Sequence, residues 1–361
     1  MKIKAAVTHN IGEDFKIEEV ELSNIKENEV LVKIVAVGVC HTDAVAWQAG
    51  ISPFPIVLGH EGSGIVEKIG SNVRAVLPGD HVVLSYSSCR ECANCLSGHP
   101  STCIRFADLN FRGKMEDGST RLSQNNHPIS TFFGQSSFGT YAIANEKNIV
   151  KVEKDIDLAL LGPLGCGIQT GSGTVLNKLR PGFGSTIAIF GCGAVGLSAV
   201  MAAKIAGCKS IIAIDINDER LNLASEIGAT YILNGSKEDV VNEITMLTNG
   251  GVDFALETTG VPNVVKKSIT ALRPHGKCAV VGVTPETTLD INDMVSKSKT
   301  LIGVIEGDAI PQLFIPELIA YYKDGRFPFD KLVKYYHFEE INQAFEDSKE
   351  GLTIKPILRI N

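Results

Sequence analysis

Four cysteines lie within fifteen residues of one another, in the pattern C-x2-C-x2-C-x7-C. They are Cys89, Cys92, Cys95 and Cys103. The residues between them are mainly polar and loop-forming, so a cluster of buried core thiols is a poor explanation of the pattern. Four thiolates complete a tetrahedral Zn²⁺ site with no open position, which is the arrangement of structural zinc. The loop 89–103 is therefore predicted to bind a structural zinc ion.

A zinc ribbon that binds nucleic acid uses a similar set of cysteines, but it normally has a basic surround. This chain has 34 Lys and Arg residues against 41 Asp and Glu residues, a formal net charge of -7. It therefore has no surplus of positive charge to displace counterions from phosphates. We expect no nucleic-acid partner and a small molecule as the ligand.

A second, dispersed set of residues suits a catalytic metal. Cys40 directly follows a β-type sequence, and His60 and Cys166 each lie between glycines or beside one. Two thiolates and one imidazole leave the fourth position of Zn²⁺ open to water or substrate, and the bound metal makes a hydroxyl more acidic. Thr42 is the neighbouring hydroxyl that can take an alcohol proton. Asp43 is placed to orient His60 from behind.

The sequence also contains a G-x-G-x-x-G motif, formed by Gly191, Gly193 and Gly196. The motif follows an apolar strand, Ile187–Phe190, and opens a helix that runs to about residue 206. In this context the glycines allow a tight turn, a close approach of the backbone to a pyrophosphate, and close packing of helix on strand. The free N–H groups at the start of the helix then face the phosphates. We interpret the segment as a dinucleotide site.

An acidic residue at the end of the next strand supports this interpretation. Asp215 lies nineteen residues after Gly196, where a carboxylate accepts hydrogen bonds from the adenosine ribose. The same charge repels a 2′-phosphate, so NAD is expected in preference to NADP. The alternative for Asp215 is a solvated turn residue. Arg220 is a candidate for the same ribose, although a surface arginine on a helix is nearly as good an interpretation.

The elements that position these residues change in character along the chain. Residues 29–39 are apolar and β-branched, and glycines then interrupt short apolar runs, which is typical of a compact β-rich domain. After about Gly167, six short apolar runs alternate with helical patterns such as 219–227 and 264–272, which predicts a doubly wound parallel sheet. The six runs are 187–190, 211–215, 231–233, 253–257, 279–283 and 301–304. The fold class is therefore α/β.

No segment of the sequence is expected to cross a membrane. The apolar run 187–203 has 17 residues and contains three glycines, whereas a spanning helix needs about 20 predominantly apolar residues. The N-terminal apolar stretch is too short for a signal peptide. Nine cysteines without an export signal are expected to be reduced thiols. A cytoplasmic location follows, and Cys192, Cys208 and Cys278 are interpreted as core residues.

Taken together, GHEGSGIVEKIGSNV, the cysteine cluster and IFGCGAVGLSAV resemble the zinc-containing medium-chain alcohol dehydrogenases from end to end. The resemblance implies a GroES-like catalytic domain, residues 1–167 and 307–361, which includes the structural zinc loop. It implies a Rossmann NAD-binding domain with a six-stranded sheet at 168–306. It further implies two zinc ions per subunit and assembly as a homodimer or homotetramer.

The resemblance also assigns roles to single residues. Cys40, His60 and Cys166 match the catalytic zinc ligands, and Glu61 matches an acidic residue close to the metal. The remaining matches lie on the cofactor: His41 and Lys355 at the pyrophosphate, Thr170 and Val195 at the nicotinamide ring, and Val281 and Val283 on the strand near that ring.

Three segments, VVLSYSSC, LGPLGCGIQTGSG and FIPELIAYYKDGRFPFDKLV, are similar to the aryl-alcohol (benzyl alcohol) dehydrogenase branch. Many family members have a proton-relay histidine where this chain has Val45, and the aryl-alcohol branch also lacks it. Oxidation of a primary aromatic alcohol is therefore expected, with an allylic terpenoid alcohol such as geraniol as the alternative substrate. A non-catalytic binding protein with structural zinc is the alternative of another class. The expected pocket residues are Trp47, Ile51, Tyr86 and Phe132, for each of which core packing is an equal alternative.

Overall fold

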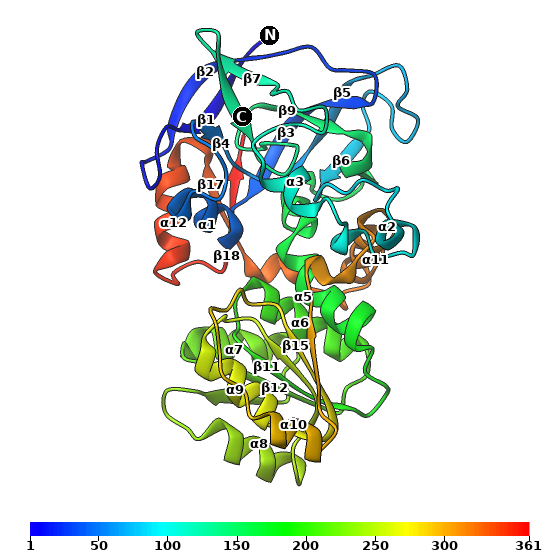
Figure 1. Ribbon diagram of the computed structural model, residues 1–361, viewed down its shortest axis with the longest axis vertical. Coiled ribbons are helices and arrows are strands. Elements are labelled where there is room, and N and C mark those ends of the chain that lie inside the picture. Colours follow the sequence, from blue (N-terminus) through cyan, green and yellow to red (C-terminus); the bar gives the residue numbers. More distant parts are fainter. Residues whose placement is uncertain (361) are drawn as a thin grey trace. The chain divides into compact units, whose positions relative to one another are not determined.

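The computed structural model describes residues 1–360, which form two compact units (Figure 1). Unit 1 comprises Met1–Gly167, Ile310–Glu317 and Asp330–Asn361, and unit 2 comprises Ile168–Ala309 and Leu318–Phe329. Among the described residues, no helix has the length and apolar character that crossing a membrane requires.

Unit 1 is built on β-structure. A closed barrel has the strand order β1-β2-β7-β8-β4, and a seven-stranded sheet has the order β10-β6-β5-β3-β18-β17, with β9 paired to β3. Its strands are β1 (Lys2–Thr8), β2 (Lys16–Leu22), β3 (Glu29–Gly38), β4 (Ile56–Val57), β5 (Glu61–Ile69), β6 (His81–Leu84), β7 (Leu122–Gln124), β8 (His127–Thr131), β9 (Tyr141–Asn145), β10 (Ile149–Val152), β17 (Val333–His337) and β18 (Lys355–Arg359). β3 is central because it is apolar on both faces and its residues are almost all buried.

Short helices connect the strands of unit 1 and cover their ends. They are α1 (His41–Ala49), α2 (Ala93–Leu96), α3 (Phe106–Phe111), α4 (Leu158–Leu161) and α12 (Ile341–Lys349), while α5 (Gly167–Gly173) and α11 (Pro311–Lys323) carry the chain between the units. The last strand, β18, pairs antiparallel with β3, so that Ile357 lies opposite Gly38. This pairing brings the end of the chain next to the first residues of α1.

Unit 2 contains a six-stranded parallel sheet with the order β13-β12-β11-β14-β15-β16. Its strands are β11 (Thr186–Phe190), β12 (Ser210–Asp215), β13 (Tyr231–Asn234), β14 (Val252–Glu257), β15 (Leu272–Val280) and β16 (Thr300–Gly303). Helices α6 (Ala194–Ile205) and α7 (Asp218–Ile227) pack together, as do α8 (Val240–Thr248) and α9 (Pro262–Thr270), and α10 (Ile291–Ser296) precedes β16. The strand order reverses between β11 and β14, and such a switch point is where ligands bind in open α/β sheets.

The predicted fold class is confirmed, and the six predicted strands are all present. Two boundaries were wrong. The strand expected over 279–283 ends at Val280, because β15 runs from Leu272 to Val280. A helix was expected over 264–272, but α9 ends at Thr270, and β15 begins at Leu272 and includes Pro274. The register between β14 and β15 shifts in this region. A proline that cannot donate to the ladder is tolerated at such an irregularity, which explains why the helical pattern was misleading.

Candidate functional site

Four side chains of unit 1 that could hold a metal ion converge on one point. They are Cys40, His60, Glu61 and Cys166, and their ligand atoms all lie within 4.8 Å of one another. Cys40 is the N-cap of α1 at the end of β3, and His60 and Glu61 enter β5. Cys166 ends the short 3-10 helix 162–165. Because β3 and β5 are paired neighbours, residues far apart in sequence are brought to the same edge of the sheet.

The histidine in this group is oriented as a metal ligand. Its Nδ1 lies 2.9 Å from Oδ1 of Asp43, and both side chains are almost fully buried. A carboxylate can only accept, so Nδ1 carries a proton, and Nε2 is the ring nitrogen that can bind a metal. Nε2 of His60 is buried and has no hydrogen-bond partner among residues 1–360. A buried nitrogen in this state beside two thiols fits a Zn²⁺ ion.

Asp43 holds more than the imidazole. One oxygen accepts from the backbone N–H of Gly59 at 3.0 Å, and the other accepts from the N–H of Cys40 at 3.1 Å. The side chain therefore caps α1 and fixes both metal-binding segments at once. The expectation that Asp43 supports His60 matches this geometry.

Glu61 forms a buried ion pair that sequence reasoning did not foresee. Nζ of Lys355 lies 3.0 Å from each carboxylate oxygen and donates to the carbonyl of Val39 at 3.2 Å. Burial raises the pKa of Glu61 to about 7, and the lysine opposes that rise. Attraction to Glu61 raises the pKa of Lys355, although burial acts against it. Lys355 was expected at the pyrophosphate, and that contact remains a prediction.

Aromatic rings surround His60 in unit 1. Phe133 stacks on the imidazole, with centroids 4.5 Å apart, and Phe132 meets it edge-on at 5.6 Å. Tyr86 is also buried, and its ring lies 5.8 Å from that of Phe106. Sequence reasoning missed Phe133. Its left-handed backbone, with a φ of 51°, is what turns consecutive phenylalanines toward one histidine, and no sequence pattern signals it.

Two of the four expected pocket residues, Trp47 and Ile51, differ in their surroundings. Trp47 packs on Phe15 and Phe345, with centroids 5.5 and 5.6 Å apart, and its indole N–H donates to the carbonyl of Glu13. It is therefore a partly buried residue that packs against the core, and its polar atom is satisfied. Ile51 is exposed on the segment that follows α1. That Trp47 and Ile51 line the substrate pocket remains a prediction.

Thr42 and His41 occupy the first turn of α1, directly after Cys40. Thr42 is half-buried, His41 is exposed, and Val45 is exposed on the next turn of the helix. The candidate hydroxyl of Thr42 therefore lies in the helical turn that follows Cys40, one of the metal-binding residues. The structure leaves the side chain of His41 free to meet solvent or a ligand.

The four clustered cysteines form a second group whose sulfur atoms lie within 4.8 Å of one another. The backbone N–H of Cys89 donates to Sγ of Cys103 at 3.3 Å, and the N–H of Cys92 donates to Sγ of Cys89 at 3.3 Å. Backbone donors aimed at sulfur favour the thiolate. Hydrogen bonds from the backbone of Cys95 and Ile104 lower the pKa of Cys92 to about 6. The group fits the predicted closed zinc site.

The three glycines of the G-x-G-x-x-G motif differ in what surrounds them, and the local geometry requires glycine at Gly191 and Gly196. Gly191 has a φ of 97°, and an added Cβ would meet Thr258 at 2.4 Å. A Cβ on Gly196 would lie 1.8 Å from the carbonyl oxygen of Gly191. A Cβ on Gly193 would meet nothing within 4 Å, so open space faces the backbone at the start of α6. This is the space that a pyrophosphate needs.

Asp215 ends β12 with its carboxylate fixed by three backbone donors. The N–H groups of Cys192, Ile216 and Asn217 lie 2.6, 2.8 and 2.9 Å from its oxygens. The carboxylate can accept further hydrogen bonds, as a ribose would require. Arg220 on α7 has a buried Nε that finds no hydrogen-bond partner in the part of the chain that the structure describes. The structure therefore places Asp215 beside the glycine-rich turn and Arg220 on the helix that follows Asp215.

The expected nicotinamide residues lie on three segments of unit 2. Thr170 is buried on α5, which touches α6 so closely that a Cβ on Gly171 would lie 1.9 Å from the carbonyl oxygen of Val195. Val281 and Val283 were expected on a strand, but β15 ends at residue 280. Val283 is 98% exposed. Both valines belong to the turn beyond the strand, at the carboxyl edge of the sheet.

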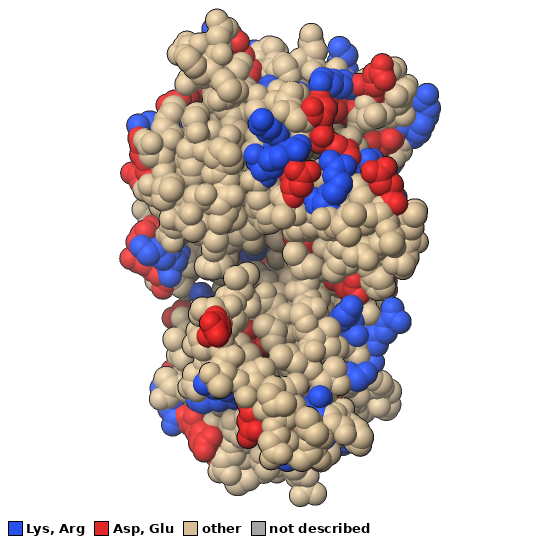
Figure 2. All heavy atoms as spheres, in the orientation of Figure 1, with Lys and Arg blue, Asp and Glu red and all other residues tan. Residues whose placement is uncertain are grey.

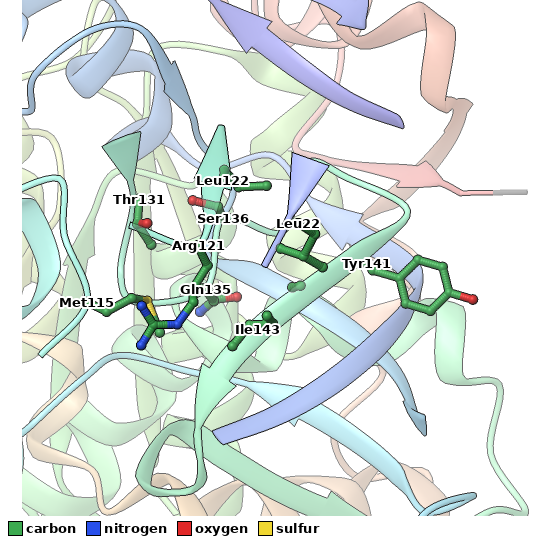
Figure 3. Close-up of a pocket in the computed structure, with 10 residues that line it drawn as sticks. Leu22, Met115, Arg121, Leu122, Thr131, Gln135, Ser136, Tyr141 and Ile143 are labelled. Atoms are coloured by element: carbon green, nitrogen blue, oxygen red, sulfur yellow. The ribbon is translucent and has the colours of Figure 1, made fainter. Parts of the chain in front are cut away.

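A small cavity in unit 1 is separate from both groups of metal-binding residues (Figure 3). It is lined by Arg121, Thr131 and Gln135 among others, and the ring of Tyr141 points away from the rest. Nε of Arg121 lies 3.1 and 3.0 Å from the two carboxylate oxygens of Glu29. The cavity therefore lies over a structural ion pair, and none of the predicted site residues lines it.

The fold and these residues define a zinc-binding dehydrogenase. A family model described as zinc-binding dehydrogenase matches residues 194–321, and a model described as alcohol dehydrogenase GroES-like domain matches residues 26–154. Accordingly, the chain belongs to the zinc-containing medium-chain alcohol dehydrogenase family.

Relatives with known names are similar over the whole chain. Geraniol dehydrogenase of Castellaniella defragrans is 47% identical over 98% of this chain and 97% of its own. The crystal structure of benzyl alcohol dehydrogenase from Acinetobacter calcoaceticus is 48% identical, with a TM-score of 0.97 and full coverage of both chains. An alcohol dehydrogenase zinc-binding domain protein from Burkholderia ambifaria is 49% identical, with a TM-score of 0.98, over 100% of this chain and 99% of its own.

Proposed function

We propose that this alcohol dehydrogenase oxidises a primary aromatic alcohol of the benzyl type to its aldehyde, with NAD as the hydride acceptor. The observation that carries the proposal is the buried, unpartnered Nε2 of His60 beside Cys40 and Cys166, with two phenylalanine rings packed on the imidazole. The reaction releases one proton and transfers one hydride, so the products are aldehyde, NADH and H⁺.

In this proposal Cys40, His60 and Cys166 hold the zinc ion, and Glu61 lies close to it. When bound, the ion supplies a Lewis acid that makes an alcohol hydroxyl more acidic. Asp43 fixes the imidazole tautomer through Nδ1 and thereby keeps Nε2 available. Lys355 holds the charge of Glu61 in a fixed place through two short contacts.

The proton leaves through the chain's own hydroxyl. Thr42 lies two residues after Cys40, and its Oγ1 accepts the alcohol proton in our proposal. Val45 offers no onward route, so His41 on the same helical turn is the candidate for passing the proton to solvent. Gly191, Gly193 and Gly196 bind the pyrophosphate, and Asp215 binds the adenosine ribose.

Two relatives of nearly equal identity support different substrates, since one is named for benzyl alcohol and the other for geraniol. Both substrates are flat next to the carbinol carbon. We favour the aromatic alcohol because Phe132, Phe133 and Tyr86 supply flat surfaces in the unit that holds the metal-binding residues. A phenyl ring that replaces a methyl group in such surroundings gains about 3 kcal/mol at about 25 cal/mol per Å².

The test is a substrate panel followed at the absorbance of reduced nicotinamide. Benzyl alcohol should exceed ethanol by about two powers of ten or more in kcat/KM. Ring conjugation favours benzyl alcohol on any enzyme, so cyclohexylmethanol and geraniol are the sharper comparisons. Benzyl alcohol should exceed both. A value for geraniol equal to or above that for benzyl alcohol would replace the aryl assignment by the terpenoid one.

A further inference from the structure

Glu257 is a buried carboxylate at the carboxyl edge of the unit 2 sheet. It is the last residue of β14, and its exposed fraction is 0%. Among residues 1–360, no lysine, arginine or histidine forms an ion pair with it. A buried carboxylate without a counter-ion is energetically costly, so its surroundings must offset that cost.

Hydrogen bonds supply part of the compensation. Oε1 accepts from the backbone N–H of Thr259 at 2.7 Å, from the N–H of Gly260 at 3.1 Å, and from the hydroxyl of Thr259. Every partner is a donor, and an ionised carboxylate accepts only. The geometry therefore suits the negatively charged form, even though burial raises the pKa of Glu257.

The carboxylate lies directly beside the turn that follows β15. A Cβ on Gly282 would lie 2.9 Å from Oε2 of Glu257 and 2.2 Å from the backbone nitrogen of Gly260. The N–H of Val281 donates to the carbonyl of Glu257 at 2.9 Å. Because Gly282 has no side chain, its backbone lies directly against the carboxylate, next to the exposed Val283.

The segment that carries Glu257 also contacts the glycine-rich turn, through Thr258. The hydroxyl of Thr258 donates to the carbonyl of Phe190 at 2.9 Å and to that of Gly191 at 3.3 Å. Glu257 therefore lies between the turn proposed for the pyrophosphate and the turn after β15.

The strand order locates the nicotinamide half of the cofactor. Asp215 is at the end of β12, on one side of β11, and the glycine-rich turn follows β11 itself. A dinucleotide held at these two points extends over the ends of β14 and β15, on the other side of β11. Glu257 and Val281 lie there. The nicotinamide ring is positively charged in NAD⁺ and neutral in NADH.

We infer that Glu257 is a positioning residue whose buried negative charge stabilises bound NAD⁺ relative to bound NADH. The inference rests on the proposed dinucleotide site. A charge in a poorly solvated place acts over several ångströms with little screening, so loss of the carboxylate should weaken NAD⁺ binding about fivefold. Binding of NADH should change little, since its ring carries no charge.

The experiment compares the dissociation constants of both nucleotides for the full-length protein and Glu257→Gln, without alcohol. The amide keeps the shape of the side chain and an oxygen that accepts from Thr259 and Gly260. The Kd of NAD⁺, measured by calorimetry, should rise about fivefold, while the Kd of NADH, measured by fluorescence, should stay within about twofold. Thr259→Val is the matched control, because it removes a hydrogen-bond donor to Glu257 without changing the charge. Its ratio of the Kd of NAD⁺ to the Kd of NADH should equal that of the unmodified protein.

Equal weakening of both nucleotides, or no change in either, would overturn the inference and leave the proposed function standing. An unmodified protein that binds neither nucleotide would instead refute the proposed function. If Glu257→Gln does not fold, the unmodified protein is titrated with benzamide adenine dinucleotide, an uncharged isostere of NAD⁺. NAD⁺ should bind about fivefold more tightly than this analogue, and equal affinities would overturn the inference.

Discussion

Asp43 shows how one carboxylate organises two segments that meet only in the folded chain. It accepts from Cys40 three residues before it and contacts His60 seventeen residues after it. Its full burial makes these hydrogen bonds strong, because no water competes for the oxygens. The pair Asp43–His60 therefore fixes the tautomer that leaves Nε2 free for a metal.

At the residue scale, Thr42→Val should lower kcat about 100-fold, because a positioned proton acceptor is lost while the shape of the side chain is kept. Steady-state oxidation of benzyl alcohol measures the effect. Gln48→Ala, on the exposed side of the same helix, is the control and should keep the kcat of the unmodified enzyme. Near-normal turnover by Thr42→Val would remove this hydroxyl from the proposed proton route.

Cofactor choice is also expected to depend on one residue. The unmodified enzyme should prefer NAD to NADP, because Asp215 repels a 2′-phosphate, and Asp215→Gly should reduce the preference about tenfold. The ratio of kcat/KM for the two cofactors is the measurement. Asp218→Asn, an exposed neighbour on α7, is the charge-matched control and should leave the ratio largely unchanged. Equal use of both cofactors by the unmodified enzyme would show that Asp215 does not face the ribose.

At the scale of elements, side chains near the C-terminus tie α12 to β17. Asp347 on α12 accepts from the hydroxyl of Tyr336 at 2.5 Å and from Nζ of Lys334 at 2.9 Å. Gln343 donates to its other oxygen at 2.7 Å. The hydrogen bond from Tyr336 is the largest cause that lowers the pKa of Asp347 to about 2. The segment leading to β18 is thereby held in place.

A pH dependence of stability follows from that shift. The folded-state pKa of Asp347 lies below its unfolded value of about 4, so its contribution is complete above that value and is lost as pH falls toward about 2. The unmodified protein should exceed Asp347→Asn in free energy of unfolding at pH 6, and the difference should shrink below pH 4. Urea titrations at several pH values measure it. Glu346→Gln, an exposed neighbour, should show no such trend, and a constant difference for Asp347→Asn would contradict the prediction.

At the scale of the whole molecule, charge agrees with a small substrate. The net charge is -7, and on the face shown in Figure 2 positive and negative side chains are intermixed without a large patch of one sign. A polyanion binds through many like-charged contacts at once. The intermixed charges on this face do not offer such a set of contacts.

The two groups of metal-binding residues predict two zinc ions per chain. Cys95→Ser should remove one ion and lower the thermal unfolding midpoint, because a closed zinc site contributes folding free energy. Metal analysis and a thermal melt measure both effects. Cys208→Ser lies outside both groups and should retain two ions. One zinc per chain in fresh, active, unmodified enzyme would contradict the assignment of two sites.

The sequence by itself determined the features that depend on local spacing. The four clustered cysteines, the three glycines after β11 and the acidic end of β12 are each encoded within a short stretch. The alternation of apolar runs with helical patterns likewise determined the parallel sheet, because strand and helix periodicities are local properties. The predicted helix end at Leu272 was wrong because it depended on the pairing of β14 with β15. A proline in a strand with a shifted register has no local sequence signature.

Only the tertiary structure decided which distant side chains meet. Lys355 pairs with Glu61 across 294 positions because β18 lies against β3. Phe133 contacts His60 because its backbone is left-handed. Trp47 packs against Phe15 and Phe345, which are far from it in the sequence. These contacts depend on strand pairing and on the packing of whole side chains. Spacing along the chain carries no information about either, so the identity of a residue indicates its chemistry but not its neighbours.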